Sequence, residues 1–162
     1  MKKNIIILGS TGSIGSTTIK VINRDKKAFK VILLTGNKNY KKLFSQAKKT
    51  NCKNILVYDE KNYLLSLKQN KNNNLTIFNN IEDFSKTLKK KVDYTMCAIT
   101  GLAGLKPTLD AIKFSQNIAI ANKESIICGW NFIERDLKKY RAKFIPIDSE
   151  HFSIWSLIKN YK

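Results

Sequence analysis

The sequence contains little cysteine, and its three cysteines, Cys52, Cys97 and Cys128, are widely spaced with no C-x-x-C pair. An odd and scattered set of this kind excludes a disulfide framework and a zinc site, and it fits a reducing compartment. Cys97 and Cys128 lie among apolar residues in the sequence. We therefore expect both to be small residues of the hydrophobic core.

Long hydrophobic runs are also missing. No apolar stretch approaches the roughly 20 residues that a membrane-spanning helix requires. Lys2 and Lys3 precede the apolar segment 5–8 and resemble the start of a signal peptide, but this segment is short and leads into a glycine-rich loop. The sequence therefore predicts a cytoplasmic protein with no membrane partner.

Acidic residues are scarce, with 12 Asp and Glu against 30 Lys and Arg, which gives a formal net charge of +18. Such an excess is one signature of a nucleic-acid-binding protein. The lysines are dispersed, however, with short runs only at 89–91 and 138–139 and no basic stripe interleaved with aromatic residues. We favour a solvated basic surface that attracts phosphorylated small molecules, and we predict no nucleic-acid partner.

The chain does contain a strand, a glycine-rich loop and a helix at its start. The apolar segment Ile5–Leu8 is followed by Gly9, Gly12 and Gly15, and helical residues come next. Glycines allow the backbone to approach a pyrophosphate, and the free N–H groups of the helix N-terminus face the anion. The spacing G-x-x-G-x-x-G differs from the commoner G-x-G-x-x-G, so a turn that binds nothing is the alternative.

Strand and helix signals alternate along the chain, which is typical of parallel βαβ units. A length of 162 residues with 43% hydrophobic residues suits one globular domain, or slightly more. The predicted fold class is α/β, a Rossmann-like, doubly wound and mostly parallel sheet with helices on both faces. The first helix is expected to bury Ile14, Thr18, Val21 and Ile22. The expected strands are 5–8, 29–34, 54–57, 75–78, 92–98, 117–121 and 144–147, and the expected helices are 14–23, 40–49, 60–69, 81–88, 107–114 and 125–140.

The stretch after the second predicted strand bears on the choice of cofactor. In dinucleotide-binding folds an acidic residue here usually holds the ribose hydroxyls of NAD. The segment Thr35–Asn39 reads T-G-N-K-N and has no carboxylate. Its lysine and asparagines suit the 2′-phosphate of NADPH, whereas the alternative is a simple turn.

Three further polar stretches follow predicted strands, at the sheet edge where α/β folds bind ligands. They are Ala98–Leu105, Ala121–Ser125 and Pro146–His151. In the last of these, Asp148 and Glu150 are two residues apart and would point to one side of an extended backbone. Two carboxylates so placed suit Mg²⁺ or Mn²⁺, although Asp148 alone could also be a helix cap.

Four motifs, L-G-S-T-G-S-I-G, A-I-T-G-L-A-G-L-x-P-T-L-x-A-I, I-A-x-A-N-K-E-S and I-P-I-D-S-E-H, occur in this order. Together they resemble the 1-deoxy-D-xylulose 5-phosphate reductoisomerase family, from Lys3 to about Leu157. The resemblance implies an NADPH-dependent oxidoreductase and isomerase of isoprenoid precursor synthesis. It would convert 1-deoxy-D-xylulose 5-phosphate, a phosphorylated sugar, to 2-C-methyl-D-erythritol 4-phosphate with Mg²⁺ or Mn²⁺.

The resemblance also implies roles for particular residues. Lys123 and Glu150 would be catalytic, Lys123, Ser149 and Glu150 would bind substrate, and Asp148 and Glu150 would bind the metal. Asn37 stands where the family usually has glycine, a mild departure because asparagine tolerates the left-handed conformation. The cofactor would be bound by Thr11, Gly12, Ser13, Ile14, Gly36, Asn37, Lys38, Asn39, Asn122 and Glu124.

The resemblance further implies the domain organisation. Residues 1–145 would form an NADPH-binding domain, and residues 146–162 would begin an α+β catalytic domain. Family members are homodimers whose chains run far beyond position 162. We therefore expect these 162 residues to bind NADPH without turning over substrate. A stand-alone NADP(H)-binding module is the alternative.

Overall fold

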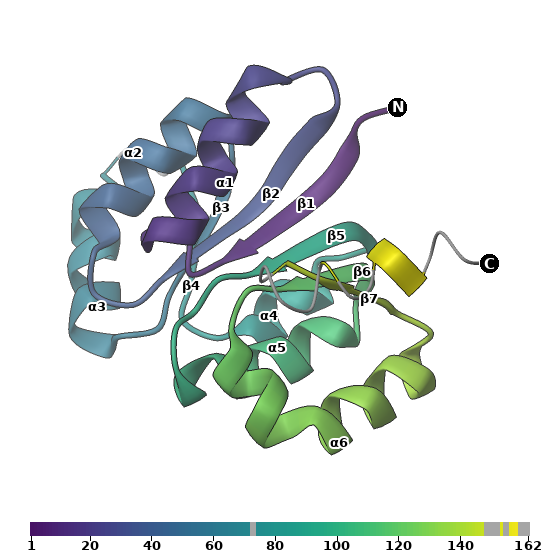
Figure 1. Ribbon diagram of the computed structural model, residues 1–162. Helices are drawn as coiled ribbons and strands as arrows, with labels where there is room; N and C mark the ends of the chain where they lie inside the picture. The colour runs from purple at the N-terminus through teal and green to yellow at the C-terminus, as the bar shows by residue number, and fades with distance from the viewer. Residues whose placement is uncertain (72–73, 148–152, 154–155, 159–162) are drawn as a thin grey trace.

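The computed structural model describes residues 1–71, 74–147, 153 and 156–158. Within them a seven-stranded sheet lies between two sets of helices (Figure 1). The strands are β1 (Lys3–Leu8), β2 (Phe29–Gly36), β3 (Asn54–Val57), β4 (Thr76–Phe78), β5 (Val92–Cys97), β6 (Ser115–Ile120) and β7 (Lys143–Pro146). The α-helices are α1 (Ser13–Arg24), α2 (Tyr40–Thr50), α3 (Glu60–Gln69), α4 (Ile81–Lys86), α5 (Leu105–Ile112) and α6 (Lys123–Tyr140), and a 3₁₀ turn, η1 (Leu102–Gly104), precedes α5.

The strand order is β4-β3-β2-β1-β5-β6-β7, and every pairing among the described residues is parallel. Helices α1 to α3 cover one face over β1–β4, whereas α4 to α6 cover the other (Figure 1). The order reverses between β1 and β5, which is the topological switch point where open α/β sheets bind ligands. The predicted fold class, a doubly wound parallel sheet, is confirmed.

Strand β1 is buried on both faces, as its unbroken apolar sequence requires. Ile5 and Ile7 pack into the cluster beneath α1 and α2, while Ile6 and Leu8 pack into the cluster on the α5 and α6 side. Ile6, Ile7 and Leu8 are fully buried. The alternation of side chains along a strand therefore divides the core into two layers, with β1 at their boundary.

The buried face of α1 differs from the predicted one. Gly15, Ile19 and Ile22 are its buried residues, whereas Ile14 is 37% exposed and Val21 is 56% exposed. The helix is turned so that Gly15 faces the loop that precedes it, where a side chain would not fit. Of the four residues that lie near helical spacing in the sequence, Ile22 is buried and Thr18 is half-buried, whereas Ile14 and Val21 are exposed.

Two cysteine predictions had different outcomes. Cys97 is 2% exposed, and burial raises the pKa of its thiol to about 12. Cys128 is exposed, so its prediction as a core residue was wrong. Cys128 lies on the outer side of α6, next to Gly129, whose buried position faces Leu105. Cys52 is also buried, and burial raises the pKa of its thiol to about 11.

Helix α5 carries a buried carboxylate, Asp110, on the layer of α4 to α6. Its two carboxylate oxygens lie 2.8 Å from the Lys106 ammonium and 2.9 Å from the Lys113 ammonium. Burial raises the pKa of this carboxyl group, but the two lysines outweigh that effect and hold the pKa below its ordinary value. Asp110 is thus an ionised and paired group at neutral pH.

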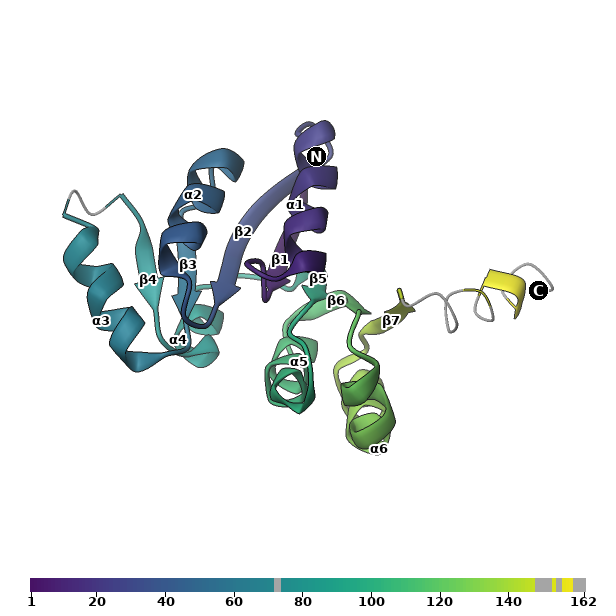
Figure 2. The ribbon, with the colours of Figure 1, turned by 60° about the vertical axis from the view of Figure 1, so that its left-hand side comes forward.

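Part of one face of the sheet carries no helix among the described residues. Over β5, β6 and β7 the side that α1 occupies elsewhere is open, as Figure 2 shows. An apolar groove of about 660 Å³ lies there, with Val21, Tyr94 and Met96 among its walls.

In the described part of the chain, no helix is long and apolar enough to cross a membrane.

Candidate nucleotide-binding site

The loop after β1 is shaped by close backbone contacts that only glycine permits. Gly9 has φ +74°, and a Cβ built on it would lie 2.8 Å from the backbone of Ala98, at the end of β5. A Cβ on Gly15 would lie 2.4 Å from the carbonyl oxygen of Gly9. The loop is therefore pressed between the end of β5 and the first turn of α1, as a tight phosphate-binding turn requires.

Buried polar side chains hold this loop in place. Gln46 of α2 donates from Nε2 to the carbonyl oxygen of Ser10 at 2.8 Å, and the Ser10 hydroxyl donates to Gln46 Oε1 at 2.8 Å. Thr35, near the end of β2, accepts from the Gly9 N–H through Oγ1 at 2.9 Å. Its carbonyl accepts from the Ser10 N–H at 2.8 Å. The loop is thus fixed before any ligand binds.

Sequence reasoning did not identify Gln46 or Ser10. The one signal was a glutamine on the same face of the predicted helix as Leu43 and Ala47, and all three are buried. A buried glutamine requires hydrogen-bond partners, so this position could have pointed to a polar contact.

The first turn of α1 offers its backbone N–H groups to an anion. Gly12 is the N-cap, and α1 has no side-chain hydrogen bond at this cap within the described residues. Gly12, Ser13 and Ile14 are exposed. Helix N-termini with free N–H groups bind phosphate groups well, because the groups converge and the helix dipole favours negative charge.

A cleft of about 470 Å³ lies beside this loop, at the carboxyl ends of the strands. It brings together Thr11, Gly12, Gly36 and Asn37 of the predicted cofactor contacts. Ser13 and Ile14 instead border the groove between α1 and β5. The walls of the cleft are Gly9, Thr11, Gly12, Thr35, Gly36, Asn37, Tyr58, Ala98, Ile99, Thr100, Ala103 and Pro107.

The segment after β2 lies at one end of the cleft. Strand β2 extends to Gly36, which pairs with Val57, so two residues that we had placed in the turn belong to the strand. Asn39 caps α2 by accepting from the Lys42 N–H at 3.0 Å. Lys38 is exposed. No carboxylate occurs in the turn itself, in agreement with the sequence.

Three further predicted residues lie where the turn after β6 leads into the first turn of α6. Asn122 is 4% exposed, and its Nδ2 donates to the carbonyl oxygens of Ile99 at 2.7 Å and Gly101 at 2.6 Å. Its Oδ1 accepts from the Ser125 N–H at 3.2 Å and caps α6. Asn122 thereby joins this turn to the loop after β5. Lys123 and Glu124, next along the chain, are exposed in the first turn of α6.

The remaining predicted residues cannot be placed in this geometry. Asp148, Ser149 and Glu150 lie outside the described residues. Within the described ranges, no group of three or more His, Cys, Asp or Glu side chains is arranged to hold a metal ion.

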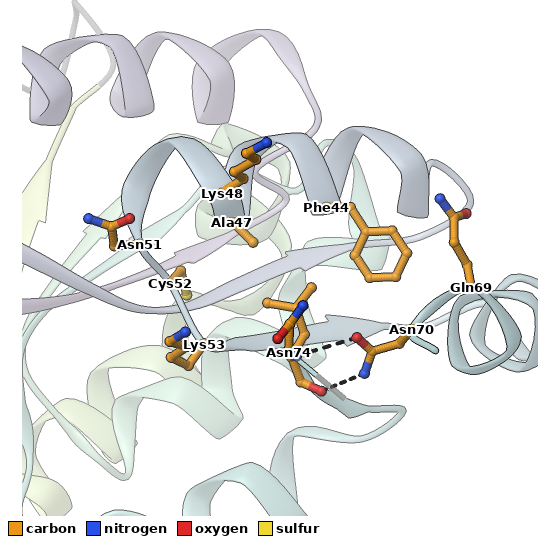
Figure 3. A pocket seen from close by; sticks show the side chains of 10 residues that line it. Phe44, Ala47, Lys48, Asn51, Cys52, Lys53, Gln69, Asn70 and Asn74 are labelled. Atoms are coloured by element: carbon orange, nitrogen blue, oxygen red, sulfur yellow. Dashed lines mark hydrogen bonds between the residues drawn. The ribbon is translucent and has the colours of Figure 1, made fainter. Parts of the chain in front are cut away.

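A second cavity, of about 450 Å³, lies at the opposite end of the sheet, near the start of β3 (Figure 3). Phe44, Ala47 and Cys52 contribute its apolar surface. Asn70 donates from Nδ2 to the carbonyl oxygen of Leu75 at 2.7 Å. None of the predicted site residues lines this cavity. It also lies away from the carboxyl ends of the strands, where parallel sheets bind ligands.

Comparison with known proteins agrees with this geometry. The family model described as 1-deoxy-D-xylulose 5-phosphate reductoisomerase matches residues 5–129. The reductoisomerase of Pelagibacter ubique is 58% identical over 162 residues, which is 99% of this chain and 42% of that protein. The chain thus spans about two fifths of the length of the curated relatives it matches.

Solved structures show the same relationship. A reductoisomerase from Zymomonas mobilis in complex with NADPH superposes with a TM-score of 0.83 at 33% identity, covering 93% of this chain and 40% of that one. A reductoisomerase in complex with NADPH, fosmidomycin and magnesium superposes with a TM-score of 0.82 at 31% identity, covering 92% of this chain and 37% of that one. The chain described above belongs to the 1-deoxy-D-xylulose 5-phosphate reductoisomerase family.

Proposed function

We propose that this chain is the NADPH-binding part of an enzyme that converts 1-deoxy-D-xylulose 5-phosphate to 2-C-methyl-D-erythritol 4-phosphate. The observation that carries the proposal is the cleft between the glycine loop and the end of β2, at the switch point of a sheet of this family. The Zymomonas mobilis relative, whose fold it shares, is in complex with NADPH.

The residues in and around the cleft fit a dinucleotide phosphate. Thr11, Gly12, Ser13 and Ile14 would bind the pyrophosphate, and the N–H groups at the start of α1 would donate to it, because no side chain caps this helix within the described residues. The segment 36–39 would bind the 2′-phosphate, and Asn122 and Glu124 would lie toward the nicotinamide. NADPH supplies the hydride of the reaction when it is bound.

Other residues would act on the substrate. We propose Lys123 as a catalytic and substrate-binding residue, since its ammonium group is exposed beside Asn122 and can offset negative charge on substrate oxygens. Ser149 and Glu150 would bind the phosphorylated sugar, and Glu150 would also be catalytic. Asp148 and Glu150 would be ligands of Mg²⁺ or Mn²⁺, hard cations that prefer carboxylate oxygens. A related structure contains magnesium.

The proposal extends to partners and location. The dispersed charge of +18 would raise the encounter rate with phosphorylated metabolites, without a nucleic-acid or membrane partner. We propose a cytoplasmic enzyme that forms a homodimer as the whole protein.

Two assays test the proposal. NADPH at saturating concentration should raise the melting temperature of the 162-residue chain, because a ligand that binds only the native state stabilises it. An NADPH-oxidation assay with the sugar phosphate and Mn²⁺ should show no turnover by this chain alone. Binding without turnover supports the assignment of a cofactor-binding part. Robust turnover would refute the expectation that these residues do not suffice, and absence of stabilisation would refute the proposed function.

A further inference from the structure

Lys42 lies within one turn of the start of α2 and reaches back to the glycine loop. Its ammonium group donates to the carbonyl oxygen of Thr11 at 2.6 Å, although the two residues are 31 positions apart in sequence. Thr11 lines the nucleotide cleft. The charge of Lys42 is therefore held at the rim of that cleft.

The end of β2 is packed into the same corner. A Cβ on Gly36 would lie 3.0 Å from Leu43 Cδ1 and 3.2 Å from Thr11 Cγ2, so the strand end fits between α2 and the glycine loop. In dinucleotide-binding folds this strand end faces the 2′ position of the adenosine ribose, and a cation nearby accommodates a 2′-phosphate. Lys42 thus stands beside the position that distinguishes NADPH from NADH.

The positive charge of Lys42 has no carboxylate partner in the described part of the chain. Among the described residues no Asp or Glu forms an ion pair with it. The carbonyl of Thr11 takes one of its three donors, and a neutral oxygen does not balance a full charge. Two donors remain for a ligand.

Lys38, the cation that the sequence indicated, is placed differently. Hydrogen bonds from Asn62 lower the pKa of the Asp59 carboxyl group, and the nearby charges of Lys38 and Lys61 lower it further. The field of Lys38 is therefore partly balanced by a neighbouring anion, whereas Lys42 forms no ion pair with any described residue.

The start of α2 also carries charge of the unfavourable sign. Its first turn contains Lys41 and Lys42 and no acidic residue. The positive end of a helix dipole repels cations, so this arrangement costs free energy in the absence of an anion. A bound phosphate would be attracted by the helix dipole and by the two lysines, and it would therefore offset this repulsion. Local violations of this kind are expected at functional sites.

We propose that Lys42 binds the 2′-phosphate of the cofactor and selects NADPH over NADH. The inference rests on the proposed function and adds a residue that neither the motifs nor the fold had assigned to the site. The ammonium group supplies charge-assisted hydrogen bonds to the phosphate oxygens, while its contact with Thr11 keeps it beside the cleft. Lys38 and the backbone of the turn complete the phosphate subsite.

The test compares Lys42→Gln with Lys41→Gln in the 162-residue chain. Both positions are exposed, both changes remove one positive charge, and Lys41 forms no hydrogen bond or ion pair among the described residues. Titrations with NADPH and with NADH give four dissociation constants beside those of the unmodified chain, and thermal melting checks that each variant is folded.

The expected result is that Lys42→Gln weakens NADPH binding about tenfold and NADH binding less than about twofold, as the loss of a charge-assisted phosphate contact predicts. Lys41→Gln should change either constant less than about twofold, because an exposed charge at a distance is screened by salt. Lys42→Arg should retain the preference for NADPH.

Three results would overturn the inference. Equal losses of NADPH affinity in the two glutamine variants would show that only the overall charge matters. Equal losses for NADPH and NADH in Lys42→Gln would show that Lys42 merely supports the Thr11 loop. If the unmodified chain binds no NADPH, the proposed function fails together with the inference. If the unmodified chain binds NADPH and either of the first two results is obtained, the inference alone fails.

Discussion

Replacing Gly15 by alanine should separate α1 from the glycine loop. The new methyl group would lie 2.4 Å from the Gly9 carbonyl oxygen and 2.5 Å from Ser10 Cα, and both atoms belong to the backbone. Restoring an ordinary contact requires a retreat of about 1 Å, which no side-chain rotation can supply. Overpacking of this kind costs about 1–3 kcal/mol, and the higher helix propensity of alanine returns less than about 1 kcal/mol.

The expected net loss in the free energy of unfolding is about 1 kcal/mol for Gly15→Ala, or roughly 2–4 °C in melting temperature for a chain of this size. Chemical denaturation followed by circular dichroism measures it. Gly12→Ala is the matched control for stability, because its Cβ would meet nothing closer than 3.4 Å and Gly12 has φ −71°. If Gly15→Ala has the same melting temperature as the unmodified chain, the close packing of loop and helix is wrong.

Two further substitutions and one labelling experiment test other parts of the structure. Gln46→Leu should lower the free energy of unfolding by about 1–3 kcal/mol, because it removes both hydrogen bonds between Gln46 and the buried Ser10, whereas Gln69→Leu on an exposed site should have little effect. Equal losses in urea denaturation would contradict this. Asp110→Asn should destabilise the protein at pH 7. Because the pKa of Asp110 is lowered on folding, its contribution is present above the ordinary value of 3.8 and is lost as the pH falls through the folded-state value. The destabilisation measured at pH 7 should therefore shrink in strongly acidic solution, and a constant difference across pH would argue against the ion pairs. One thiol per native chain, that of Cys128, should react with a disulfide reagent at pH 8, since the other two are buried with raised pKa values; rapid labelling of three thiols would show that the core is open.

Local sequence patterns were sufficient for much of the fold. Strand β3 and helix α3 have the predicted bounds, because an apolar run and a helical repeat are each enclosed by polar residues. The parallel order follows from the alternation of strands and helices. The glycine loop was found from the pattern of an apolar strand, three glycines and a helix, although Gly9 also lies against the distant backbone of Ala98.

Features that depend on how segments of the chain pack together were not predicted from the sequence. Which side of α1 is buried depends on how Gly15 meets the backbone of Gly9, which helical periodicity does not reveal. Thr35 and Gly36 resemble a turn, yet pairing with β3 keeps them in the strand. Neither Gln46 nor Lys42 was singled out among the polar residues of the predicted helix 40–49. Their contacts with Ser10 and Thr11 arise only when α2 packs beside the loop.

The central claim is that the cleft beside the glycine loop binds NADPH. Isothermal titration of the 162-residue chain with NADPH and NADH, at two salt concentrations, tests it most directly. We expect saturable binding of one NADPH per chain, weaker binding of NADH, and an affinity for NADPH that survives moderate salt. Binding that collapses as steeply with salt as a non-specific phosphate-backbone contact would contradict it, as would equal affinity for the two cofactors or no binding at all.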